Sequence, residues 1–156
     1  MAIARHAGIA QRTAQTVWTG RLANGSGIVT SGSGAFGELP VTWAARIQRP
    51  DGMTSPEELA AAAHASCFSM ALALRLGEHG ATAQRLEVTA TVSLDDVDGR
   101  PTVVSSALAV DAVVPELDAV AFRSIVNEAA DLCPISRLFA GAEITVEASL
   151  DSGPDA

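Results

Sequence analysis

Two cysteines are the residues of this chain that could most readily carry out chemistry, and they lie far apart at Cys67 and Cys133. A cysteine reacts as its thiolate, so a reactive one needs a nearby cation or a helix N-terminus that lowers the pKa of the thiol. Arg46 is the candidate cation in the segment before Cys67, and Arg49 is its nearest rival. The alternative is that both cysteines are small buried hydrophobic residues, which is the commoner fate of a cysteine on an apolar stripe.

A metal site is a second possibility, because His64 stands one helical turn before Cys67 and Cys133 could join them. A closed zinc site needs four ligands, however, and the remaining histidines fall in a tail (His6) and near a helix end (His79). His64 is therefore better interpreted as a satisfied histidine or a packing residue, and we expect no metal.

The composition predicts one compact domain over residues 1–156, with loose tails at 1–12 and 151–156. The net charge of -8 would repel phosphate backbones and anionic lipids, so we expect no nucleic acid and no membrane partner. No apolar stretch approaches the length needed to span a bilayer, and the N-terminus lacks a secretion pattern. These features predict a cytoplasmic protein.

The first third of the chain alternates as β-strands do, and it must position the candidate arginines. Strands are expected at Thr13–Leu22, Ile28–Thr30 and Leu39–Gln48. In the third, alternation places Arg46 on the face opposite Trp43.

A helix is expected to carry Cys67. Ser55 and Pro56 are typical of a helix start, Glu57 follows in the first turn, and Gly77 marks the end. A stripe at spacings of three and four, expected to be the buried one, comprises Leu59, Ala63, Cys67, Met70 and Leu74.

The second half of the chain predicts an antiparallel hairpin, Leu86–Leu94 with Thr102–Val114, and a helix over Asp118–Leu132. Pro134 ends that helix and can begin a short one to about Ala140, before a last strand at Glu143–Leu150. Cys133 would then sit near a helix N-terminus, which favours a thiolate. Strand clusters interrupted by two main helices give an α+β class.

Two motifs around the cysteines carry a family resemblance. The run from Thr54 to Leu72, with its Ala-His-Ala-Ser-Cys-Phe-Ser-Met stretch, closely resembles the central helix of the OsmC/Ohr family, the osmotically inducible and organic hydroperoxide resistance proteins. It looks more like the OsmC branch. The block Cys133-Pro134-Ile135-Ser136-Arg137 is similar to the second cysteine motif of that family. The resemblance spans roughly residues 15 to 150.

The resemblance implies an intertwined homodimer with antiparallel sheets around central helices and two sites at the subunit interface. It also implies a thiol-dependent peroxidase that reduces organic hydroperoxides in oxidative stress, with neither haem, flavin nor metal. By position, Cys67 matches the attacking cysteine, Cys133 the resolving cysteine that closes a Cys67–Cys133 disulfide, Glu57 the carboxylate and Arg46 the arginine. The loop before Glu57 is about a residue longer than the family pattern, which leaves Arg49 as an alternative. The reductant implied is an external dithiol, of a dihydrolipoyl type.

Helix geometry adds one constraint of its own. Ten residues separate Glu57 from Cys67, which is about 15 Å of rise on a straight helix. Either the helix breaks between them or Glu57 comes from the other subunit, and the second option is favoured. The apolar surroundings of Phe68 and Met70 favour hydrophobic alkyl hydroperoxides over hydrogen peroxide. The alternative function is a non-catalytic dimeric protein that binds small apolar ligands.

Overall fold

The computed structural model describes residues 9–151, and the chain forms two compact units that we describe separately, residues 1–56 and 57–156. Most of the predicted tails, residues 1–8 and 152–156, lie outside the described residues, as does His6. The single domain expected from the sequence stays a prediction.

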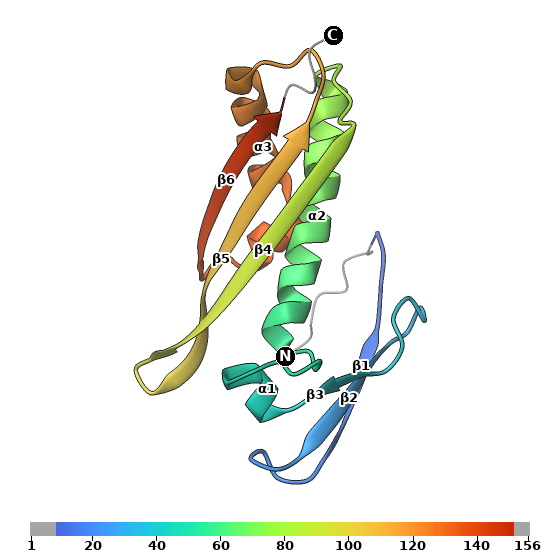
Figure 1. Cartoon of the computed structure of the whole chain (residues 1–156), viewed down its shortest axis with the longest axis vertical. Coiled ribbons are helices and arrows are strands. Elements are labelled where there is room, and N and C mark those ends of the chain that lie inside the picture. The colour runs from blue at the N-terminus through green and yellow to red at the C-terminus, as the bar shows by residue number, and fades with distance from the viewer. Residues whose placement is uncertain (1–8, 152–156) are drawn as a thin grey trace. The chain divides into compact units, whose positions relative to one another are not determined.

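The first unit holds a three-stranded antiparallel sheet in the order β1-β2-β3 (Figure 1). Its strands are β1 (Ala14–Thr19), β2 (Ser26–Ser31) and β3 (Leu39–Val41). Gly27 of β2 pairs with Trp18 on one side and Val41 on the other, and a Cβ there would come within 2.9 Å and 2.8 Å of their side chains. A glycine is therefore required where these two large side chains converge. The first two predicted strands are confirmed.

The third predicted strand, Leu39–Gln48, is wrong beyond Val41. Thr42 accepts a hydrogen bond from the Ala45 N–H at 3.0 Å and caps the short helix α1 (Trp43–Ile47). Arg46 thus lies on a helix, where residues three apart share a face. Its guanidinium carbon lies 5.7 Å from the centre of the Trp43 ring, so the two side chains are neighbours and not on opposite faces. The segment is short enough to fit either the two-residue period of a strand or the 3.6-residue period of a helix, and the Thr42 cap favours the helix.

The second unit packs two helices against a three-stranded sheet in the order β4-β5-β6 (Figure 1). Its elements are α2 (Pro56–Glu78), β4 (Arg85–Val97), β5 (Arg100–Val113), α3 (Ala119–Leu132), α4 (Pro134–Leu138) and β6 (Glu143–Asp151). The hairpin closes through Asp98 and Gly99, both with positive φ, which is the geometry that an Asp-Gly turn favours. β6 runs parallel to β5, so the second sheet is mixed and not wholly antiparallel as expected, because the α3–α4 segment connects the two strands as a crossover. The α+β class and the predicted elements of this half are confirmed.

The buried stripe of α2 is not the one that the sequence suggested. Its buried residues are His64, Phe68, Ala71, Leu72 and Leu76. Met70 is 73% exposed and Leu74 52% exposed, and Cys67 is half-buried at the edge of the core. An alanine-rich helix is apolar on most of its sides, so periodicity predicts the helix but does not select the face that packs.

α2 is also long and apolar enough to cross a membrane by length and composition alone, with a mean hydropathy of 1.4 in its most apolar window. The expectation that no stretch approaches this length is therefore wrong. The core helices of soluble proteins pass the same test, and Phe68, Leu72 and Leu76 of α2 pack in the core of the second unit. Because only 28% of that window is buried, much apolar surface of α2 is exposed in the single chain.

Candidate functional site

Cys133 lies at the junction of two helices. It ends α3 and precedes Pro134, the first residue of α4. Its N–H donates to the Ala129 carbonyl at 3.0 Å, which completes the last turn of α3. Its ψ of 115° is extended, so α3 ends at Cys133 and α4 begins with the next residue. Proline at the first helical position explains why one helix ends and another begins here. The Cys133 side chain is fully buried, and both cysteines are free thiols.

The fold brings Cys67 to Cys133, although they are distant in sequence. The Cys67 thiol interacts with the Cys133 thiol and with the backbone N–H of Ile135 in the first turn of α4. Burial raises the pKa of the Cys67 thiol above its usual value of 9.0; the Ile135 N–H opposes that rise, and the Cys133 sulfur adds to it. Cys67 is thus favoured as a neutral thiol in this unit, and a positive charge is needed to make it a thiolate at neutral pH.

Glu57 lies in the first turn of α2, on the same helix as Cys67. α2 is continuous from Pro56 to Glu78, so no helix break shortens the distance of about 15 Å between the two positions. Of the two options left by the sequence, a broken helix is excluded.

Arg46 and Arg49 both belong to the first unit. Arg46 lies in α1 over the Trp43 ring, and Arg49 follows α1 just before Pro50. The placement of a guanidinium at Cys67, by either arginine, stays a prediction.

His64 is the polar residue at this site that sequence reasoning left without a partner. It is fully buried, and both ring nitrogens are hydrogen-bonded: Nδ1 to the Ser106 hydroxyl at 2.6 Å and Nε2 to the Ser136 hydroxyl at 2.9 Å. Burial lowers the pKa of His64 below its usual value of 6.5, so the imidazole is neutral. Two serines occupying both nitrogens support a structural role for His64 over the metal-ligand alternative. Ser106 carried no signal in the sequence, and Ser136 stood there only as part of the second cysteine motif, because their contact with His64 joins distant elements.

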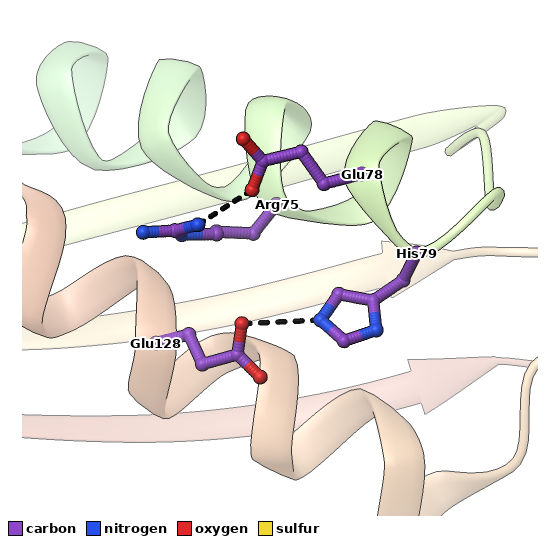
Figure 2. A network of polar contacts seen from close by, with 4 residues as sticks. All are labelled: Arg75, Glu78, His79 and Glu128. Atoms are coloured by element: carbon purple, nitrogen blue, oxygen red, sulfur yellow. Dashed lines mark hydrogen bonds and ion pairs between the residues drawn. The ribbon is translucent and has the colours of Figure 1, made fainter.

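A separate polar contact ties the far end of α2 to α3 (Figure 2). His79 Nε2 lies 3.1 Å from Glu128 Oε2, and Arg75 pairs with Glu78 at 2.5 Å along α2. These side chains are partly exposed, so each pair is worth less than about 1 kcal/mol. The His79–Glu128 pair joins the end of α2 to α3, whereas the Arg75–Glu78 pair lies within α2.

Comparison with known proteins gives a consistent result. A family described as OsmC-like protein matches residues 49–149. The chain is 42% identical to Peroxiredoxin OsmC of Escherichia coli (strain K12) over 138 residues, which cover 88% of this chain and 95% of that protein. The crystal structure of the organic hydroperoxide resistance protein OhrB of Bacillus subtilis is similar with a TM-score of 0.68 and 28% identity, covering 89% of this chain and 98% of that one.

The fold likeness extends to more distant sequences. An OsmC-like protein of Vibrio cholerae is similar with a TM-score of 0.72 at only 13% identity, and the match covers 90% of this chain and 100% of that one. At this identity the likeness concerns the fold alone.

Proposed function

This chain belongs to the OsmC-like family and is a cysteine-based peroxidase, and we propose that it reduces organic hydroperoxides through a Cys67 sulfenate and a Cys67–Cys133 disulfide. The observation that carries the proposal is the meeting of two thiols from different elements, Cys67 from α2 and Cys133 from the α3–α4 junction. A resolving thiol must reach the attacking sulfur to form a disulfide, and these two already interact.

The proposed reaction consumes one hydroperoxide and two thiols. The Cys67 thiolate attacks the terminal oxygen of the hydroperoxide, the O–O bond breaks, and the alkoxide leaves and takes a proton to become an alcohol. The Cys133 thiolate then attacks the Cys67 sulfenic sulfur; the S–S bond forms and the S–O bond breaks, releasing water after protonation. An external dithiol returns two electrons and restores both thiols.

Activation of Cys67 is assigned to Arg46, with Glu57 holding the guanidinium. The pKa of Cys67 is raised by burial, so a guanidinium against its sulfur would offset that rise. Because α2 is unbroken, we assign Glu57 to the partner subunit's α2. Mixing Glu57→Ala subunits with Cys67→Ser subunits tests this, since the heterodimer should recover one complete site. A heterodimer with no activity would contradict a shared site.

A homodimer is supported by apolar side chains that the single chain leaves in solvent. On α2 these are Met70 and Leu74, exposed at 73% and 52%, and Val17 and Ile28 of the first sheet are also exposed. Such apolar surface is typical of an interface. A second copy of this chain is the occupant that we propose, in an intertwined arrangement that builds each site from both subunits.

The substrate and reductant belong to the same proposal. The apolar core against which Cys67 packs favours an alkyl hydroperoxide over hydrogen peroxide, and a dihydrolipoyl-type dithiol is the proposed reductant. Faster consumption of hydrogen peroxide than of cumene hydroperoxide, at equal thiol supply, would contradict this preference. The cytoplasmic location and the absence of nucleic acid and membrane partners remain predictions.

The decisive experiment is a titration of the reduced protein with cumene hydroperoxide. One equivalent should consume both thiols and release one cumyl alcohol, and mass spectrometry should find a Cys67–Cys133 bond. Cys133→Ser should instead accumulate a Cys67 sulfenic acid that dimedone traps, and Cys67→Ser should consume no peroxide. Thiol consumption far below one equivalent, without alcohol release, would favour the apolar-ligand binding protein.

A further inference from the structure

The buried His64 lies one helical turn from Cys67, and its two hydrogen bonds join three elements. Nδ1 bonds Ser106 of β5 and Nε2 bonds Ser136 of α4, while the ring also packs 5.3 Å from the Phe139 ring. A neutral imidazole has one N–H donor and one acceptor nitrogen, and a serine hydroxyl can meet either need. His64 is therefore fully satisfied only while α2, β5 and α4 keep their mutual positions.

Ser136 belongs to the same four-residue segment that supplies both partners of Cys67. Cys133 contributes its thiol and Ile135 its N–H at Cys67, and Ser136 contributes its hydroxyl at His64. Two residues of one α2 turn thus receive three contacts from the start of α4. α4 has only five residues, too few to hold a helix by its own backbone hydrogen bonds, so its position depends on such side-chain contacts.

We infer that His64 is a positioning residue for the Cys67–Cys133 pair, acting through Ser136 to hold the start of α4 against α2. The hydrogen bond fixes where the Cys133 sulfur and the Ile135 N–H lie relative to the Cys67 sulfur. The Ser106 bond also holds the ring to β5, so the sheet as well as α4 sets the position of the imidazole. This inference rests on the proposed function for its biological purpose, but the thiol pairing can be measured without any peroxide.

Ser136→Ala is the variant that separates this role from core stability. Ser136 lines a pocket of about 460 Å³ that also touches Asn127 and Asp131. Water from this pocket can replace the lost hydroxyl at Nε2, so the variant should fold. The water would satisfy the imidazole without connecting it to α4.

The measurement is the equilibrium constant for Cys67–Cys133 disulfide formation in buffers of reduced and oxidised dithiothreitol, read by mass spectrometry, together with the rate of closure. Ser136→Ala should lower both by about 10- to 100-fold, the loss typical of a misplaced reacting pair. Ser69→Ala is the matched control, because its hydroxyl on α2 bonds the Ala65 carbonyl and not His64. It should leave both values within about twofold of wild type, since the fold-change depends on the α4 contact.

Ser136→Thr keeps a hydroxyl at this position and should keep the wild-type values. If the loss in Ser136→Ala came only from a disturbed core, the threonine variant would not keep them. His64→Gln should behave as Ser136→Ala does, and it tests the role again if the alanine variant unfolds. Wild-type values in a folded Ser136→Ala or His64→Gln would overturn the inference. Peroxide turnover is assayed separately: a wild-type chain that closes the disulfide in dithiothreitol but reduces no hydroperoxide would sink the proposed function and leave the role of His64 standing.

Discussion

At the scale of single residues, the surroundings of the Cys67 thiol disfavour the thiolate form that a peroxidase needs. Its sulfur is partly buried and next to a second sulfur, and both conditions raise its pKa. One backbone N–H from Ile135 opposes them. A peroxidase that works at neutral pH needs a cation that lowers the pKa of this thiol, so the arginine assignment should be tested first.

The pH dependence of Cys67 alkylation should identify that arginine. In a Cys133→Ser background, Arg46→Ala should move the midpoint for iodoacetamide labelling to higher pH by about 1 to 3 pH units, because the thiolate loses its cation. Arg49→Ala is the matched control and should leave the midpoint near that of the parent. The reverse pattern would assign the role to Arg49.

His64 makes stability depend on pH. Burial lowers its pKa in the folded state below 6.5, the value that applies when it is unfolded, and its contacts with Ser106 and Ser136 bring no charge. Between these two pKa values the unfolded chain binds more protons, so acidification favours unfolding. The free energy of unfolding should therefore fall as the pH drops below about 6.5, by at most about 1.4 kcal/mol per pH unit. Urea titrations of wild type and His64→Gln check this, because the glutamine variant should lose that component of the slope.

At the scale of elements, α3 is the helix that most directly positions the candidate site, since Cys133 is its C-cap residue. At its start, Asp118 Oδ1 accepts hydrogen bonds from the N–H groups of Val120 at 2.9 Å and Ala121 at 2.8 Å. Both donors belong to the first turn, where backbone N–H groups have no partner within the helix.

Removing this cap should destabilise the second unit. Asp118→Ala should lower the free energy of unfolding by about 1 kcal/mol, because the two N–H groups then depend on water. Asp118→Asn keeps an acceptor oxygen and should recover most of the loss. Chemical denaturation followed by circular dichroism measures both, and equal stability of the alanine and asparagine variants would argue against a capping role.

At the scale of the whole molecule, the single chain leaves apolar surface uncovered. Met70 and Leu74 of α2 are exposed at 73% and 52%, and Val120 of α3 is exposed at 82%. α2 therefore has two apolar faces, one in the core of the second unit and one in solvent. Burial of the second face against another copy would remove that surface from water and favour association.

Charging the exposed face of α2 should disrupt association. Met70→Glu combined with Leu74→Glu should give a monomer in sedimentation velocity, because carboxylates are costly in an apolar interface. If the site is shared as proposed, this variant should also lose most peroxidase activity, because Glu57 of the partner subunit would be absent. Thr89→Glu, at an exposed position of β4, is the control and should keep the wild-type sedimentation and activity. A double variant that stays a dimer would place the interface elsewhere.

The sequence by itself determined the elements of the second unit, because local signals there agree. Pro56 begins α2, the Asp98-Gly99 turn closes the hairpin, and Pro134 separates α3 from α4. The cysteine motifs also sufficed for the family. Local signals conflicted only after Val41, where a threonine cap converted an expected strand into α1.

Only the tertiary structure decided which face of α2 packs and which residues meet. Alanine-rich periodicity does not distinguish two apolar faces, so Met70 and Leu74 were expected inside and lie outside. The contacts of Cys67 with Cys133, and of His64 with Ser106 and Ser136, join residues far apart in sequence. Such pairings follow from how helices and strands pack, because they depend on the free energy of the whole core and not on the propensity of any one segment.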